Sequence, residues 1–218
     1  METFSNVIQP DTWESRLNDH FLKGKWNSEI FGNINPVVIE LGCGKGEYTV
    51  ELAQKYPEKN FIGVDIKGAR MWRGAKTAFE NQILNVRFLR TRIEFINSFF
   101  DKDEVAEIWL TFPDPHPRRR STTKRLSGPA FLNHYRLFLK NNGIIHLKTD
   151  DHGLYLFTLS VVKQNGLEIL TATDDLYASG LHDDILSIKT HYEKIFIAEG
   201  KKINYLSFRL NNKKAIEE

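Results

Sequence analysis

The sequence is poor in cysteine and has no long apolar run. Its single cysteine, Cys43, excludes a disulfide within the chain, and with no paired histidine evident we predict a small packed thiol rather than a nucleophile. No apolar stretch approaches the roughly 18 residues of a membrane-spanning helix, so we expect no membrane partner. Residues 1–10 lack a basic start followed by an apolar block, which predicts no secretory signal and a cytoplasmic location.

Composition indicates an ordinary globular protein. The 218 residues are 41% hydrophobic and 27% charged, and no repeat or low-complexity tract divides them. Aromatic residues in polar surroundings predict an N-terminal helix and arm over residues 1–35, followed by a domain over residues 36–218 in a single compact whole. The sequence leaves both a monomer and a homodimer open.

Basic residues are concentrated in one segment. The net charge is only +2, yet five of the eight residues 118–125 are Arg or Lys and none is acidic. Salt confines the influence of each charge to about 8–10 Å, so local density matters more than the total. The segment is typical either of a phosphate-binding surface or of a solvated basic loop.

Strand and helix patterns alternate along most of the chain. Strands are predicted at 37–41, 61–65, 86–90, 107–112, 143–148, 167–172 and 203–210. Helices are predicted at 47–56, 68–82, about 94–100, 128–140 and near 190–198. This alternation predicts an α/β fold with a mostly parallel seven-stranded sheet and helices on both faces. The alternation ends after 167–172, so we expect an antiparallel C-terminal edge strand.

A glycine-rich turn follows the first predicted strand. Gly42-x-Gly44-x-Gly46 lies where ligands bind in open parallel sheets, and the missing side chains let a ligand approach the backbone. Glu40 would repel a pyrophosphate from this turn. Asp65 lies nineteen residues after Gly46, at the spacing of a ribose-binding carboxylate. The set predicts a nucleoside cofactor without phosphate, and S-adenosyl-L-methionine (SAM), which carries a sulfonium and an ammonium, meets that description.

Two later strands also end in carboxylates. Prolines in the segment 111–117 stiffen the chain and hold Asp114 at the carboxyl edge of the sheet. His116 in the same segment is a base, a stacking surface or an exposed loop residue. Asp150 follows the fifth strand, and it either caps the next helix or faces the same cleft as Asp114.

Four motifs together resemble the bacterial tRNA (guanine-N7-)-methyltransferases, which are class I SAM-dependent enzymes of Rossmann-like fold. They run in order over about residues 36–210: Glu40-x-Gly-x-Gly-x-Gly, Phe112-Pro-Asp-Pro with following basic residues, Lys148-Thr-Asp and Thr190-His-Tyr-Glu. Many class I methyltransferases share the first motif, whereas the other three in combination are specific. The resemblance implies methyl transfer from SAM to N7 of guanine 46 in the variable loop of tRNA.

The resemblance also implies a role for each matching position. Asp114 is implied as the catalytic carboxylate between donor and substrate. The expected cofactor-binding residues are Glu40, Gly42, Gly44, Asp65, Arg92 and Asp114. The expected substrate-binding residues are Arg118, Asp150, Thr190, Tyr192 and Glu193, and no metal is expected.

Two positions depart from the family pattern. The family usually has tryptophan after Asp-Pro, where this chain has His116. After the third strand the family often has Asp or Asn near the adenine, where this chain has Thr91-Arg92. Adenine recognition then falls either to the main chain around Arg92 and Ile93 or to Glu94.

Three other functions compete with this one. A class I methyltransferase for a small molecule or protein would leave the basic segment and the Thr190-x-Tyr192-Glu193 motif without a role. A non-catalytic RNA-binding module would have no need of the carboxylates that accompany the turn. A nicotinamide dehydrogenase is disfavoured by Glu40 and by the spacing of the third glycine.

Overall fold

The computed structural model describes residues 4–10, 16, 18–181 and 185–217. Its chain divides into two units, Met1–Ala106 and Glu107–Glu218. The predicted division between an arm over 1–35 and a domain over 36–218 stays a prediction.

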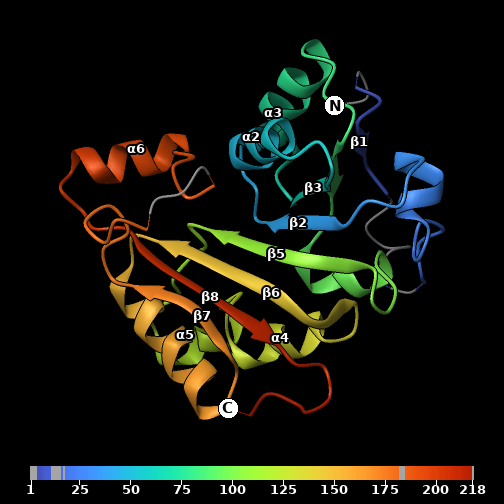
Figure 1. The fold of residues 1–218 in the computed structure, drawn as a ribbon. Coiled ribbons are helices and arrows are strands. Elements are labelled where there is room, and N and C mark those ends of the chain that lie inside the picture. The colour runs from blue at the N-terminus through green and yellow to red at the C-terminus, as the bar shows by residue number, and fades with distance from the viewer. Residues whose placement is uncertain (1–3, 11–15, 17, 182–184, 218) are drawn as a thin grey trace. The chain divides into compact units, whose positions relative to one another are not determined.

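Parallel strands form the sheet of the first unit, in the order β1-β4-β3-β2 (Figure 1). Every residue of β2 and β3 is buried, as expected for parallel strands covered on both faces. The elements of this unit are β1 (Val7–Ile8), π-helix η1 (Trp26–Phe31), β2 (Val37–Leu41), α2 (Glu47–Lys55), β3 (Asn60–Asp65), α3 (Gly68–Glu80), β4 (Val86–Arg90) and the 3-10 helix η2 (Ile93–Ser98).

The N-terminal arm differs from its prediction. Val7 and Ile8 pair with Phe88 and Leu89 of β4, so the described residues contain eight strands rather than the predicted seven. A two-residue strand is too short to show periodicity, and for that reason the sequence pattern missed it. Part of the predicted helix falls on residues 11–15 and 17, which lie outside the described residues.

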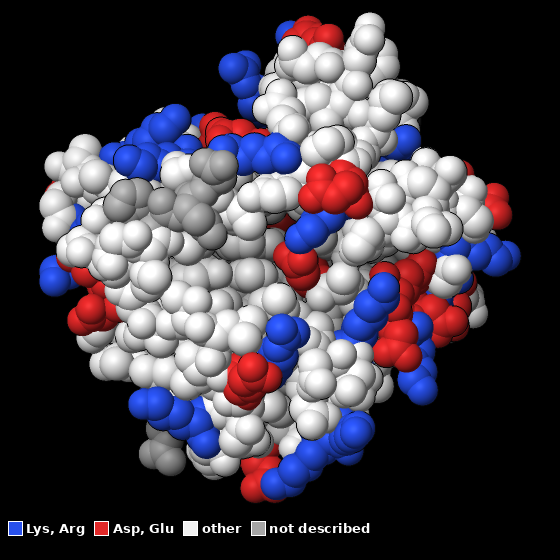
Figure 2. Space-filling model, in the orientation of Figure 1, with Lys and Arg blue, Asp and Glu red and all other residues white. Residues whose placement is uncertain are grey.

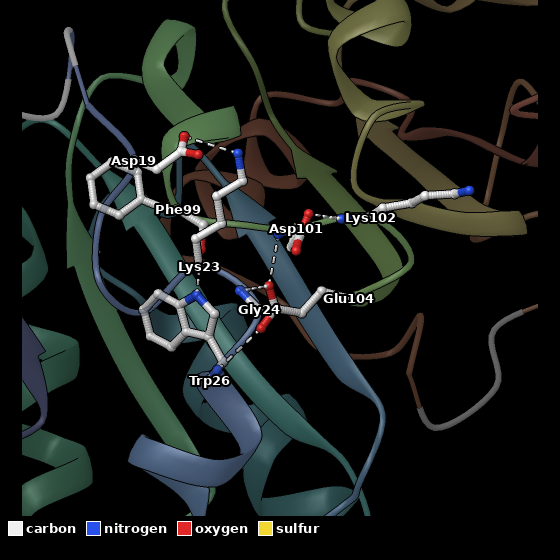
Figure 3. A network of polar contacts seen from close by, with 8 residues as sticks. All are labelled: Asp19, Lys23, Gly24, Trp26, Phe99, Asp101, Lys102 and Glu104. Atoms are coloured by element: carbon white, nitrogen blue, oxygen red, sulfur yellow. Dashed lines mark hydrogen bonds and ion pairs between the residues drawn. The ribbon is translucent and has the colours of Figure 1, made fainter.

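One carboxylate fastens the end of the arm to the rest of the first unit (Figure 3). The Glu104 carboxylate accepts hydrogen bonds from the backbone N–H groups of Gly24, Trp26 and Asp101, at 2.8, 3.1 and 2.8 Å. The buried Trp26 indole donates to the Phe99 carbonyl at 2.8 Å. Because one carboxylate binds backbone donors from both segments, we infer that Glu104 fixes the path of the chain into η1.

The sheet of the second unit contains the antiparallel pairs. Its strands run in the order β5-β6-β8-β7, with β8 antiparallel to both neighbours. Its elements are β5 (Val105–Thr111), which begins in the first unit, the 3-10 helix η3 (Arg119–Lys124), α4 (Pro129–Tyr135), β6 (Leu139–Thr149), α5 (His152–Gln164), β7 (Ile169–Thr173), α6 (His191–Ala198) and β8 (Asn204–Leu210). The predicted antiparallel C-terminal strand is confirmed, but its predicted place at the edge is wrong. Strand β8 lies between β6 and β7, and β7 forms the edge, because strand order depends on pairing that the sequence pattern does not record.

Most predicted boundaries agree with the structure to within about two residues. The exceptions lie around residues 135–143, since α4 ends at Tyr135 rather than at 140 and β6 opens at Leu139 rather than at 143. Helix α5 was given no predicted bounds. Short apolar runs such as Phe138-Leu139 fit either a helix or a strand, and strand pairing decided this one. Within the described residues, no helix is both long and apolar enough to cross a membrane.

Candidate functional site

The glycine turn joins β2 to α2 through three left-handed residues. Gly42, Gly44 and Gly46 have φ values of +79°, +54° and +70°. Such values favour glycine because a Cβ atom would strain the backbone. At Gly46 a Cβ atom would also come within 2.5 Å of Cε1 of Phe88, whereas at Gly44 the nearest atom is 4.0 Å away. Gly46 is therefore required by packing, and Gly44 leaves open space beside the backbone.

Two buried carboxylates support this turn. Asp65, 8% exposed, accepts hydrogen bonds from the N–H groups of Gly44 at 2.9 Å and Lys67 at 2.7 Å. Glu40, 3% exposed, accepts a hydrogen bond from the Thr49 hydroxyl of α2. The first unit thus brings the predicted residues Glu40, Gly44 and Asp65 into one acidic structure, which suits a cation and disfavours a phosphate.

Cys43 lies inside the turn and is buried. Burial raises the pKa of its thiol well above the usual value, and the charges of Glu40 and Asp65 raise it further. A neutral thiol is a poor nucleophile. These properties agree with the predicted packed thiol.

In the segment after β4, one side chain is buried in the core and the next is exposed to solvent. Thr91 is fully buried, and its N–H donates to the Asp65 carbonyl at 3.2 Å. The exposed Arg92 side chain forms an ion pair with Glu94 at 3.2 Å and lies over the Phe95 ring. The side chain of Arg92 is thus engaged by Glu94, and cofactor binding by Arg92 stays a prediction.

The proline-rich loop after β5 holds Asp114 on a strained backbone. Phe112 and His116 on either side of it have φ values of +49° and +43°, which are uncommon outside glycine. The Phe112 N–H donates to the carbonyl of Lys148 in β6 at 2.7 Å. The Asp114 side chain is exposed. Strained, non-glycine conformations of this kind concentrate at functional sites.

Arg125 clamps this loop. Its guanidinium donates to the carbonyls of Pro115 at 3.0 Å and His116 at 3.2 Å, and it lies 4.2 Å from the centre of the Phe157 ring. One residue of the predicted basic segment, Arg125, therefore has a structural role that sequence reasoning missed. Arg118 and Arg120 are exposed and can meet phosphates. Across the face in Figure 2, basic side chains are interspersed with acidic ones, in keeping with the small net charge.

The end of β6 carries two adjacent aspartates with different contacts. The Asp151 carboxylate caps α5 by accepting from the Leu154 N–H at 2.6 Å. Asp150 instead forms an ion pair with Lys201 at 3.1 Å. Of the two interpretations of Asp150, helix capping is wrong because its neighbour occupies that position. Substrate binding by Asp150 stays a prediction.

Helix α6 presents two chemically different sides. Thr190 caps the helix, since its hydroxyl accepts from the Glu193 N–H at 3.2 Å. Tyr192 is 44% exposed, and its ring stacks on Phe196, which in turn contacts the Phe112 ring. Glu193 is fully buried. The helix thus holds three predicted substrate residues in fixed but unequal environments.

Two partners of Glu193 escaped the sequence reading. Lys148, also fully buried, forms an ion pair with Glu193 at 2.9 Å, and the Tyr177 hydroxyl donates to the same carboxylate at 2.6 Å. Lys148 places a charge in the strand predicted at 143–148, and this charge was the available signal. Tyr177 gave no signal in the sequence, because its contact with Glu193 forms only when the chain folds.

The second unit accordingly carries Asp114, Arg118, Asp150 and the α6 residues, and the first carries the glycine turn and its carboxylates. Among the described residues, no cluster of three or more His, Cys, Asp or Glu side chains could hold a metal ion.

Known proteins resemble this chain over nearly its whole length. The family model described as "Putative methyltransferase" matches residues 34–206. A "tRNA (guanine-N(7)-)-methyltransferase" of Christiangramia forsetii is 50% identical, covering 96% of this chain and 94% of the relative. A relative of the same name from Bacteroides fragilis is 51% identical, covering 90% and 77%.

The solved structure of an antibiotic-related methyltransferase has a TM-score of 0.63 at 18% identity and covers 89% of this chain and 96% of that chain. This likeness confirms the predicted fold. The two sequence relatives are about 50% identical to this chain and share one name, so they identify the family more narrowly than the solved structure does. The chain belongs to the tRNA (guanine-N7-)-methyltransferase family.

Proposed function

We propose that this protein transfers the methyl group of SAM to N7 of guanine 46 in the variable loop of tRNA, forming 7-methylguanosine. The observation that carries the proposal is family membership at about 50% identity over nearly the whole chain. The acidic glycine turn and the exposed arginines of the basic segment supply the chemistry that a cationic methyl donor and a polyanionic acceptor need.

The first unit fits the donor. Gly42 and Gly44 expose backbone in left-handed conformations, and the space beside Gly44 is open. Asp65 keeps lone pairs available for ribose hydroxyls while it holds the turn, and Glu40 supplies negative charge toward an ammonium group. Bound SAM supplies an electrophilic methyl group on a sulfonium. The side chains expected to hold it are those of Glu40 and Asp65, with the backbone of Gly42, Gly44 and Arg92.

Asp114 stabilises charge in this proposal. Guanine N7 has a free lone pair, so no proton need leave before the methyl group arrives, and alignment supplies much of the rate. Positive charge then develops on the purine. A carboxylate held on the stiff loop between Phe112 and His116 is preorganised to stabilise that charge. Arg118 contacts phosphate in this scheme, which orients the tRNA.

The guanine edge is read by acceptors. N1–H and the 2-amino group form a paired donor pattern that adenine lacks, and Asp150 and Glu193 are the carboxylates assigned to it. Tyr192 offers an exposed aromatic ring, which suits a base that has left its stack. Thr190 fixes the start of α6 and thereby the orientation of Glu193. Because the proposed substrate is tRNA, the proposed location of the protein is the cytoplasm.

The test is product identification. The protein is incubated with methyl-labelled SAM and unmodified bulk tRNA, which is then digested to nucleosides. Label in 7-methylguanosine supports the reaction, and a tRNA transcript with adenine at position 46 should receive none. Label in another nucleoside would refute the assignment to N7. Tight tRNA binding without label would favour the non-catalytic RNA-binding module.

A further inference from the structure

A buried ionic cluster in the second unit links β6, α6 and the segment before α6. The Lys148 ammonium contacts Glu193 Oε1 at 2.9 Å and donates to the carbonyls of Leu186 at 3.0 Å and Ile188 at 2.8 Å. The Tyr177 hydroxyl donates to the same Oε1 atom at 2.6 Å. Both donors thus converge on one oxygen of the carboxylate.

The second oxygen, Glu193 Oε2, is buried and has no hydrogen-bond partner among the described residues. Buried carboxylate oxygens are normally satisfied, because losing water without gaining a donor is costly. A buried ion pair also gives little net stability compared with apolar side chains of the same volume. Stability alone is therefore a poor explanation for this cluster.

Both donors face the carboxylate from the side of Oε1. The Lys148 ammonium forms the ion pair with Oε1 at 2.9 Å. Burial, and after it the hydrogen bond to Glu193, raises the pKa of Tyr177, so the phenol remains a neutral donor. With Oε1 saturated, Oε2 remains the open acceptor of this group.

We propose that Lys148 and Tyr177 are positioning residues that hold Glu193 with Oε1 engaged and Oε2 reserved for the donor edge of the target guanine. This inference rests on the proposed function and adds to it the residues that set base specificity. Glu193 is fully buried in this structure, so arrival of the base must uncover Oε2. A carboxylate held from one side then presents the other oxygen without reorganisation.

The sharpest variant is Tyr177→Phe, which removes one hydroxyl and keeps the ring. Two tRNA transcripts serve as probes, one with guanine and one with inosine at position 46; inosine lacks only the 2-amino group. We expect Tyr177→Phe to lower kcat/KM on the guanine transcript about tenfold, which is the scale of one hydrogen bond to a charged group. The value of kcat/KM on the inosine transcript should fall much less. The ratio of kcat/KM on guanine to kcat/KM on inosine should therefore decrease.

Tyr205→Phe is the matched control, because the buried Tyr205 also hydrogen-bonds a side chain, His146, at 2.8 Å. The control should leave the guanine-to-inosine ratio unchanged. In a Glu193→Gln background, Tyr177→Phe should add little, since both changes act on one group. An unchanged ratio in Tyr177→Phe, or equal losses on both transcripts, would overturn the positioning role.

Lys148→Met tests the second donor with circular dichroism and SAM affinity as checks on folding. If it unfolds, Tyr177→Phe and the Glu193→Gln background still decide the question. Affinity for the two transcripts, measured without turnover, separates this inference from the proposed reaction. A wild-type protein that makes no 7-methylguanosine refutes the reaction. The inference fails if the variant then binds both transcripts as the wild type does.

Discussion

The glycine turn and the proline-rich loop both follow a strand, and both contain left-handed residues. In the turn these residues are glycines, so the conformation is inexpensive. In the loop they are Phe112 and His116, and each costs about 1–3 kcal/mol that surrounding contacts must offset. The loop gains those contacts from Arg125 and from the Lys148 carbonyl. One conformation is thus built into the residues themselves, and the other is imposed by packing.

The largest expected effect comes from replacing Asp114, which the strained loop holds. Asp114→Ala should lower kcat by about 10²–10³-fold, because it removes a preorganised charge from the reacting centre. Affinity for SAM should stay within several-fold, measured by titration calorimetry. Asp174→Ala, at an exposed aspartate of the same unit, is the control. Near-normal turnover of Asp114→Ala would remove this residue from the catalytic assignment.

Gly46→Ala should destabilise the turn strongly. A left-handed alanine with its Cβ 2.5 Å from the Phe88 ring combines backbone strain with overpacking, about 2–4 kcal/mol in the free energy of unfolding. Gly44→Ala meets no atom closer than 4.0 Å and should lose about 1 kcal/mol from strain alone. Urea denaturation measures both. Equal losses would show that packing against Phe88 is not what selects glycine at position 46.

Arg125→Met tests whether the loop depends on its clamp. The variant loses two hydrogen bonds from a charged donor and its contact with Phe157, so we expect about a tenfold fall in kcat. SAM affinity should not change. Arg120→Met, at an exposed position of the same segment, should leave kcat unaltered. If both variants behave alike, Arg125 belongs to the phosphate-binding surface rather than to the loop.

The smallest expected change concerns the exposed arginines. Arg118→Ala with Arg120→Ala should weaken tRNA binding and reduce the slope of log affinity against log salt by about one for each lost phosphate contact. Lys213→Ala with Lys214→Ala provides a control of equal charge at exposed sites. A slope identical to the wild type would leave the segment as a solvated basic loop.

The local parts of the fold were accessible to sequence reasoning. Strands β2 and β4 were predicted at their observed bounds, because apolar runs and glycine turns report local structure. Strand β1, the end of α4 and the position of β8 between two other strands were not, since each depends on pairing with distant residues.

The candidate site divides in the same way. Glu40, the glycines and Asp65 follow one another at characteristic spacings, and the structure brings them together. The contacts of Lys148 and Tyr177 with Glu193 join residues far apart in the chain. No periodicity in the sequence records such a pairing.

The sequence alone determined the α/β alternation, the acidic glycine turn and the family motifs, because these depend on residue type and short spacings. Only the tertiary structure decided which of two adjacent aspartates caps α5, that Arg125 faces inward while Arg118 faces solvent, and that Glu193 is buried with two donors on one oxygen. These outcomes depend on where distant elements meet. Folding fixes that through burial and hydrogen-bond satisfaction rather than through local propensity.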